Sequence, residues 1–259
     1  MLTISPIAAF DDNYIWLLRD SASPVATVVD PGDEEPVLAA LERDGLALGA
    51  ILITHHHYDH VGGVRALVDA WPDVQVFGPR DKRVPAVTQA IGEGDAVDLP
   101  GDGQRLGVFE VPGHTSSHIA YLGAGALFCG DTLFAAGCGR VFDGTFDQLA
   151  ASLQRIAGLP PETLVYCAHE YTLANLGFAA WVEPDSAPIA ARTAEARRLR
   201  ELGRPTVPSR LADELDTNPF LRIGEAAVKA AAESFAGRRL ETGAEIFTAL
   251  RRWKDERYD

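Results

Sequence analysis

Short apolar and β-branched runs alternate with polar turn residues through the first two thirds of the chain. Most of these runs end at Gly, Pro or Asp, as strands usually do. They predict strands at residues 14–18, 26–29, 50–53, 74–77, 107–111, 119–122, 126–129 and 164–167. Apolar residues at helical spacing predict helices between them at 34–42, 63–70 and 146–156. Mixed strands and helices indicate a layered α/β sandwich rather than a pure β barrel.

After about residue 172 the pattern becomes helical. Helix-forming residues and helical spacing predict helices at 173–181, 188–202, 225–235 and 244–254. The segment 205–219, which holds three prolines, is expected to be an ordered loop between helices. We therefore expect two domains, an α/β domain over residues 1–172 and a helical domain over residues 173–259.

Charge is divided in a similar way. Residues 1–191 hold 9 basic and 25 acidic residues, a balance of −16, whereas residues 192–259 hold 14 and 12, a balance of +2. The overall charge of −14 argues against nucleic-acid binding, which needs many cations to neutralise phosphates. The absence of a long apolar run or a basic, signal-like N-terminus predicts no membrane association and a cytoplasmic protein.

The three cysteines argue against two kinds of stabilised fold. Cys129, Cys138 and Cys167 form no CxxC pair and are odd in number. A disulfide framework and a thiolate zinc site are therefore not expected. We expect each cysteine to pack as a small apolar residue.

The densest group of metal-binding side chains lies in the segment THHHYDHVGG at residues 54–63. It follows a predicted strand and precedes a predicted helix. His55 and His57, two residues apart at the strand exit, can reach one cation, and Asp59 and His60 can reach a second. Imidazole and carboxylate ligands suit zinc, iron or manganese. The alternative, a polar surface loop rich in histidine, is disfavoured by the apolar segments on both sides.

Three further candidate ligands follow other predicted strands. His114 follows the strand at 107–111, Asp131 the strand at 126–129, and His169 the strand at 164–167. Each alone could be a hydrogen-bonded histidine or a turn aspartate. Together with the histidine-rich segment they predict a metal site built on loops at strand ends.

Three neighbouring polar residues are not expected to be ligands. His56 points to the opposite face from His55 and His57. His118 is expected to be a core or supporting histidine. Asp30 is expected to be a turn residue at a strand end, with orientation of a ligand as the lesser alternative.

These motifs resemble those of the metallo-β-lactamase superfamily, through HxHxDH, the later Gly-His and Gly-Asp, and the last histidine. Within it the chain resembles the glyoxalase II, or hydroxyacylglutathione hydrolase, family over nearly its whole length. The stretches that carry this resemblance are FDDNYIWLL (10–18), VVDPGD (28–33), THHHYDHVGG (54–63), PGHT (112–115), FCGDTLFAAGCGR (128–140), CAHEYTLANLGFA (167–179) and NPFLR (218–222).

The resemblance implies a four-layer αββα fold followed by a small helical domain, and two divalent metal ions, zinc before iron or manganese. It implies that the first ion is held by His55, His57 and His114 and the second by Asp59, His60 and His169. It also implies that Asp131 bridges both ions. The implied reaction is hydrolysis of S-(2-hydroxyacyl)glutathione thioesters, chiefly S-D-lactoylglutathione, by a hydroxide between the metals, with Asp59 and Asp131 as catalytic residues. This reaction is the second step of methylglyoxal detoxification.

For the substrate, the resemblance implies contacts from Arg140, Phe142, Tyr171, Arg251 and Lys254. Arg140 stands where some relatives carry lysine, which keeps the charge. Phe142 stands where some carry tyrosine, so a hydroxyl contact to glutathione is lost. Arg251 and Lys254 share a helix face, and a solvated basic face is the alternative interpretation of that pair. We expect a monomer that acts on this small molecule.

Other functions of the same superfamily remain open from the sequence. A persulfide dioxygenase with one iron needs only two histidines and a carboxylate, which His55 or His57, His114 and Asp131 could supply. Lactonase or lactamase activity is a further alternative. A non-catalytic scaffold is disfavoured because all seven ligands are present.

Overall fold

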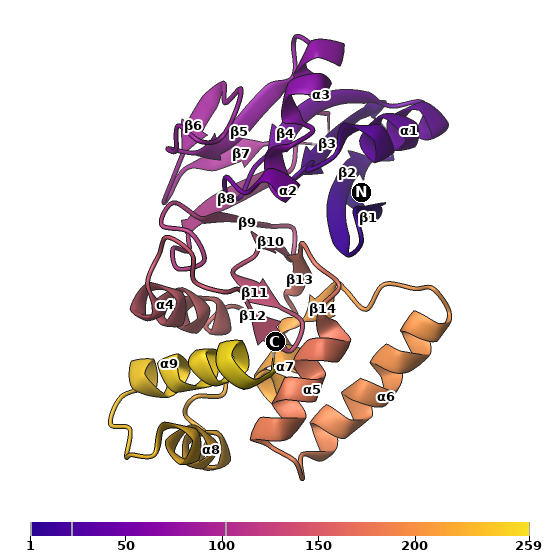
Figure 1. Ribbon diagram of the computed structural model, residues 1–259. Helices are drawn as coiled ribbons and strands as arrows, with labels where there is room; N and C mark the ends of the chain where they lie inside the picture. Colours follow the sequence, from indigo (N-terminus) through magenta and orange to yellow (C-terminus); the bar gives the residue numbers. More distant parts are fainter. Residues whose placement is uncertain (1, 22, 102, 259) are drawn as a thin grey trace. The chain divides into compact units, whose positions relative to one another are not determined.

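The computed structural model describes residues 2–21, 23–101 and 103–258 (Figure 1). By their contacts these residues form two compact units, which we describe separately. The first unit comprises Met1–Glu110 and Ser117–Gly130, and the second comprises Val111–Ser116 and Asp131–Asp259. Within the described residues no helix is both long and apolar enough to cross a membrane.

The first unit contains a six-stranded sheet in the order β1-β2-β3-β4-β5-β6. Its strands are β1 (Leu2–Ala9), β2 (Asn13–Asp20), β3 (Val25–Val29), β4 (Ala47–Leu52), β5 (Gln75–Pro79) and β6 (Gln89–Ile91). The first three strands pair antiparallel and the others parallel. The parallel pairs need crossover connections, and helices α1 (Glu34–Asp44), α2 (Tyr58–Val61) and α3 (Val64–Ala70) lie in them.

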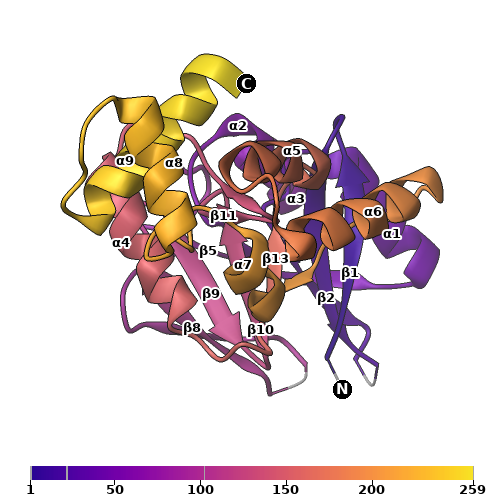
Figure 2. The ribbon, with the colours of Figure 1, turned by 90° about the horizontal axis from the view of Figure 1, so that it is seen from below.

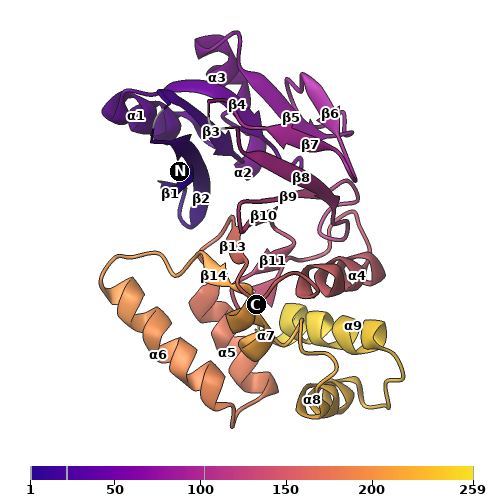
Figure 3. The same ribbon diagram turned by 180° about the vertical axis from the view of Figure 1, so that it is seen from behind.

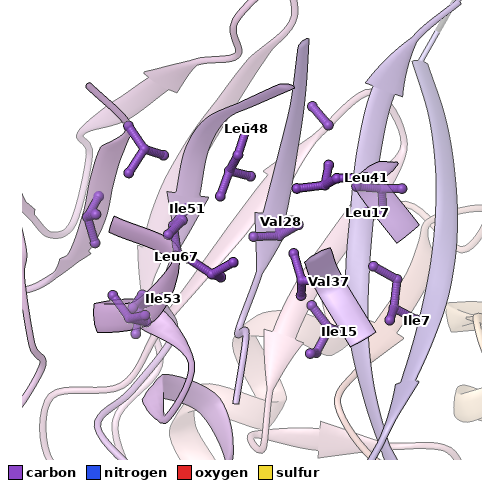
Figure 4. Packing of buried hydrophobic residues seen from close by; sticks show 14 of the residues in the cluster. Ile7, Ile15, Leu17, Val28, Val37, Leu41, Leu48, Ile51, Ile53 and Leu67 are labelled. Carbon is purple, nitrogen blue, oxygen red and sulfur yellow. The ribbon is translucent and has the colours of Figure 1, made fainter. Parts of the chain in front are cut away.

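A hydrophobic core joins this sheet to the helices that cover one of its faces. Val37 and Leu41 of α1 and Leu67 of α3 pack against sheet residues such as Val28 and Ile51 (Figure 4). α1 begins at the N-cap Asp33, whose side chain accepts the Glu35 N–H at 3.0 Å. The sheet and its helices thus form a rigid support for the loops at the strand ends.

Four antiparallel strands make a second layer of the same unit: β7 (Ala96–Asp98), β8 (Arg105–Glu110), β9 (Ile119–Gly123) and β10 (Ala126–Gly130). The buried Tyr121 of β9 donates its hydroxyl hydrogen to the carbonyl of Ile53, just beyond β4, at 2.8 Å. Burial raises the pKa of Tyr121 well above its usual value, so this hydroxyl stays a donor. The hydrogen bond ties the β9 layer to the end of β4, where the histidine-rich loop begins.

The second unit is mainly helical. Its strands are β11 (Leu133–Phe134), β12 (Gly137–Cys138), β13 (Leu164–Cys167) and β14 (Ser209–Arg210). Its helices are α4 (Phe146–Ala157), α5 (Thr172–Val182), α6 (Ala187–Glu201), α7 (Leu211–Thr217), α8 (Ala226–Ala236) and α9 (Gly243–Trp253), followed by the π-helical turn η1 (Lys254–Tyr258). Helices α5 and α6 lie side by side (Figure 2), as do α8 and α9 (Figure 3).

The predicted loop at 205–219 was wrong in part. It contains β14 and the seven-residue helix α7. The prolines at 205, 208 and 219 lie outside this helix, so they limit its length without preventing it. Cys129, Cys138 and Cys167 are buried, as expected of cysteines that pack as small apolar residues.

Candidate metal centre

The seven predicted ligands fall into two groups, one in each unit. The first unit carries His55, His57, Asp59 and His60, and the second carries His114, Asp131 and His169. All but His57 and Asp59 are buried. His55 and His57 lie on the loop after β4, and Asp59 and His60 lie in the short helix α2 that follows it; His114, Asp131 and His169 lie on loops after strands.

In the first unit a buried relay orients His55. Thr54 donates its hydroxyl hydrogen to Asp30 Oδ2 at 2.7 Å, and its backbone N–H to Asp30 Oδ1 at 2.8 Å. The Thr54 hydroxyl oxygen therefore accepts from His55 Nδ1–H, 3.0 Å away. This hydrogen bond places the proton on Nδ1 and leaves the lone pair of Nε2 available to a metal. His57 Nδ1 lies 3.1 Å from that Nε2 atom, so both ring nitrogens face one point.

Asp30 orients a second histidine directly. His60 Nδ1 lies 3.0 Å from Asp30 Oδ2, so Nδ1–H donates to the carboxylate and Nε2 is left as the ligand atom. Asp30 is a non-glycine residue at φ 52°, as a tight turn at the end of β3 requires. Asp30 is thus both a turn residue and an orienting residue, the second of which the sequence analysis gave only as the lesser alternative.

Asp59 is fixed by a residue that the sequence analysis did not single out. The buried Asn13, at the start of β2, donates Nδ2–H to Asp59 Oδ2 at 3.0 Å. The same oxygen lies 3.4 Å from His60 Nε2. Asn13 stands within the stretch FDDNYIWLL, but only the fold brings it to a residue 46 positions away.

The second unit arranges two histidines around one carboxylate. His114 Nε2 lies 3.4 Å from Asp131 Oδ2, and His169 Nε2 lies 3.3 Å from Asp131 Oδ1. His114 Nδ1–H donates to the Arg140 carbonyl at 2.7 Å, which again leaves Nε2 as the ligand atom. Each carboxylate oxygen of Asp131 therefore faces a different imidazole, as a bridging ligand requires.

These distances fit metal coordination. Two ligand atoms on a tetrahedral ion, with bonds of about 2.0–2.1 Å, lie about 3.3 Å apart. The His60–Asp59, His114–Asp131 and His169–Asp131 separations of 3.4, 3.4 and 3.3 Å match this value. Charge-assisted N–H···O hydrogen bonds are shorter, at about 2.7–2.9 Å. The donor sets of both units are thus suited to divalent metal ions.

A close backbone contact explains one glycine next to Asp131. A Cβ atom on Gly139 would lie 2.0 Å from the Asp131 carbonyl oxygen and 2.9 Å from His114 Nδ1. Any side chain there would displace Asp131 and His114 together. Glycine at this position is therefore a condition for the ligand arrangement of the second unit.

The β11–β12 hairpin between Asp131 and Arg140 is held by buried polar side chains. Asn218 Nδ2–H donates to the Gly137 carbonyl at 2.9 Å, and Glu214 accepts the Ala136 N–H at 2.7 Å. Asn175 donates to the Ala135 carbonyl at 3.0 Å. These three side chains come from α5, α7 and the residue after α7. They fix a turn in which Ala136 adopts φ 55°.

Three predicted substrate residues lie at the surface of the second unit. The Arg140 side chain is exposed and lies 3.7 Å from Asp255 Oδ1. Phe142 is 65% exposed and packs edge-on against the His114 ring at 5.2 Å. Tyr171 is 37% exposed and stacks on the His169 ring at 4.7 Å. The two aromatic residues thus contact candidate metal ligands directly.

Arg251 and Lys254 differ from the solvated basic face considered as an alternative. Arg251 is 1% exposed and donates to the Cys138 carbonyl at 3.0 Å and to Asp255 Oδ1 at 2.9 Å. Lys254 is 6% exposed, and its ammonium lies 5.7 Å above the Tyr258 ring. Both cations belong to a partly buried cluster that also includes Asp255 and Cys138. Burial raises the pKa of Cys138 to about 11, although Arg251 lowers it.

The two remaining histidines are placed as predicted. His56 Nδ1 faces Asp81 Oδ2 at 3.7 Å. Asp81 itself is held by Arg83 and Ser117, which lower its pKa well below its usual range. His118 is buried and stacks on His55 at 4.6 Å, in a supporting position.

Comparisons with known proteins cover the whole chain. A family model described as "Metallo-beta-lactamase superfamily" matches residues 10–169, and one described as "Hydroxyacylglutathione hydrolase C-terminus" matches residues 170–257. The hydroxyacylglutathione hydrolase of Alkalilimnicola ehrlichii is 56% identical over 256 residues, which cover 99% of this chain and 100% of that protein.

Two solved structures are also similar. ETHE1 from Myxococcus xanthus has a TM-score of 0.68 at 24% identity, covering 100% of this chain and 93% of its own, which shows the fold alone. TTHA1623, solved in a di-iron-bound form, has a TM-score of 0.54 at 30% identity, covering 64% of this chain and 91% of its own.

Proposed function

Because the chain belongs to the hydroxyacylglutathione hydrolase family of the metallo-β-lactamase superfamily, we propose that it hydrolyses S-D-lactoylglutathione to D-lactate and glutathione. The chain is a thioester hydrolase with the fold expected from the sequence, an αββα sandwich followed by a helical part. The observation that carries the choice of substrate is the 56% identity to a relative named hydroxyacylglutathione hydrolase, over 99% of this chain and 100% of that protein.

The protein binds divalent metal, and the finer proposal is two zinc ions per chain. His55, His57 and His114 would hold one ion, and Asp59, His60 and His169 the other, with Asp131 shared. The tautomers of His55, His60 and His114 support this assignment. Iron is the alternative, since TTHA1623 binds two irons at 30% identity.

The metals would supply an ionised water at neutral pH and stabilise the negative charge that develops on the thioester oxygen. The residues of the chain have separate tasks. Asp131 would keep His114 and His169 on opposite oxygens, and Asp59, which Asn13 holds in place, would orient the attacking water as a hydrogen-bond acceptor. Thiols have a pKa of about 8.5, so the leaving thiolate needs little help from a general acid.

Glutathione carries two carboxylates, and the cationic cluster of the second unit is proposed to bind one of them. Arg140, Arg251 and Lys254 would supply the charge, and Tyr171 and Phe142 would line the approach to the ligands. Guanidinium binds carboxylate with two parallel hydrogen bonds, which suits the exposed Arg140. We also propose that residues 1–172 form the catalytic domain and 173–259 the substrate-binding domain of a cytoplasmic monomer.

The first experiment follows loss of the thioester of S-D-lactoylglutathione, with metal per chain measured on the same sample. We expect rapid hydrolysis with about two metals per chain. His57→Ala should lose metal and activity, whereas the matched control His56→Ala, whose side chain faces Asp81, should keep both. A fully metallated protein that leaves the thioester intact would contradict the assignment. One iron per chain with oxygen uptake on a glutathione persulfide would favour a dioxygenase.

A further inference from the structure

A notch in helix α5 receives the ring of Tyr258. A Cβ atom on Gly177, in the interior of α5, would lie 1.9 Å from the Tyr258 hydroxyl oxygen and 3.1 Å from its Cζ. Glycine inside a helix is destabilising relative to alanine, so its presence there calls for a packing reason. The Tyr258 side chain is that reason, because the phenol needs the space that a methyl group would fill.

Two aromatic side chains on the same helix also contact Tyr258. The Tyr258 ring meets Trp181 edge-on at 4.9 Å and Phe178 at 5.7 Å. Such contacts stabilise beyond the area they bury. Tyr258 is thereby tied to α5 at two adjacent turns, which fixes the far end of the turn η1.

The turn that Tyr258 closes is a π-helix, Lys254–Tyr258, that continues directly from α9. Single π-helical turns are rare and occur frequently at functional sites. The ends of helices fray unless their last turn is anchored. The seat of Tyr258 on α5 therefore preserves a backbone conformation that an untethered segment would not hold.

This turn organises the cationic cluster. Its first residue, Lys254, places its ammonium 5.7 Å above the Tyr258 ring. Its second, Asp255, accepts from Arg251 at 2.9 Å and lies 3.7 Å from Arg140. Arg251 also donates to the Cys138 carbonyl at 3.0 Å. Asp255 thus orders two guanidinium groups from one position.

We propose that Tyr258, seated against Gly177, is a positioning residue for substrate binding, which sets the cluster of Arg140, Arg251 and Lys254 that receives a substrate carboxylate. This inference rests on the proposed hydrolysis of a glutathione thioester. Tyr258 acts through Lys254 and Asp255 and is not a contact of the reacting atoms. Its loss should weaken ground-state and transition-state binding alike, and so change KM rather than kcat.

The test is a substitution that creates a steric clash and a second substitution that removes it. Gly177→Ala should raise KM for S-D-lactoylglutathione about tenfold, as loss of one charge-assisted hydrogen bond would, and leave kcat within about twofold. Adding Tyr258→Phe removes the hydroxyl oxygen at 1.9 Å and leaves Cζ at 3.1 Å, so the double variant should recover most of the affinity. Tyr258→Phe alone should bind as the parent does, and Tyr258→Ala should resemble Gly177→Ala.

The matched control is Gly224→Ala, where an added Cβ has no neighbour within 4 Å. Calorimetric binding of S-methylglutathione, which the enzyme does not cleave, gives a readout independent of turnover. Thermal unfolding and metal content show which variants fold. If Gly177→Ala does not fold, Tyr258→Ala takes its place in the test.

The two proposals fail in different ways. A parent protein that neither cleaves the thioester nor binds S-methylglutathione contradicts the proposed function. A parent that does both, while folded Gly177→Ala and Tyr258→Ala keep its KM and affinity, overturns the positioning role. A loss of kcat as large as the expected rise in KM, with KM itself unchanged, would overturn it as well. So would a double variant that recovers no affinity.

Discussion

Replacing Asp30 by asparagine should test how far one carboxylate controls metal binding. Asp30 is 4% exposed and accepts three hydrogen bonds, two from Thr54 and one from His60 Nδ1. Asparagine has one acceptor oxygen. If that oxygen faces the Thr54 backbone, its NH₂ group faces His60 Nδ1–H, and two donors oppose each other.

The magnitude follows from the tautomer. His60 can relieve that opposition by moving its proton to Nε2, which is the atom that the ligand set requires to be unprotonated. Removing such an orienting partner typically costs about 10- to 100-fold in metal affinity, or about 1.4–2.7 kcal/mol. The alternative, an unsatisfied buried donor, costs the fold about 1–3 kcal/mol. We expect the tautomer shift to prevail in Asp30→Asn, because it leaves no buried donor unsatisfied, so the loss should fall on affinity for the ion that His60 is proposed to hold more than on the stability of the metal-free protein.

The assay is zinc competition with a chromophoric chelator, together with urea unfolding of the metal-free protein. Asp69→Asn, an exposed site on α3, is the matched control and should behave as the parent does. Zinc affinity of Asp30→Asn within about twofold of the parent would refute the tautomer reasoning, since the smallest expected loss is about tenfold.

Three other predictions concern separate parts of the molecule. Asn13→Ala should lower the affinity for one of the two proposed ions about tenfold, because Asp59 loses the donor that fixes its ligating oxygen. A chelator titration should then show one weak and one tight site. Phe142→Tyr should lower KM for S-D-lactoylglutathione about two- to tenfold through a new hydrogen bond, with an unchanged KM as the contrary outcome in steady-state kinetics. The Glu245 carboxylate binds the backbone N–H of Glu241 first, then Arg238 and the backbone N–H of Thr242, which lowers its pKa from 4.5 to about 2. Its stabilising effect is therefore complete above pH 4.5 and lost between pH 4.5 and about 2, so urea unfolding should show Glu245→Gln and the parent converging over that range.

The sequence could predict the strand ends that carry the ligands because each ligand follows a short apolar run. The segment at 54–63 follows β4, His114 follows β8, Asp131 follows β10 and His169 follows β13. The helices after residue 172 are also close to their predicted bounds, since their periodicity is regular. Local pattern and element type thus agree in these regions.

The residues that support the ligands could not be predicted in the same way. Asn13 and Asp59 are 46 positions apart, and Glu214 and Ala136 are 78 positions apart, so only the tertiary fold reveals these pairs. The edge strand β1 was missed because Pro6 interrupts its alternation, and an edge strand tolerates proline where a central one does not. The substrate roles and the domain boundary at residue 172 stay predictions.

The hairpin between Asp131 and Arg140 has a consequence for biosynthesis. Its turn depends on side chains that the ribosome adds later, from Asn175 to Asn218. The Cys138 carbonyl accepts a hydrogen bond from Arg251, which is synthesised 113 residues later. A nascent chain that has exposed the histidine-rich loop therefore cannot yet hold Asp131 in place. If the proposed ligand set is right, its completion would be a late event, and chains released early would bind metal only through the histidine-rich loop.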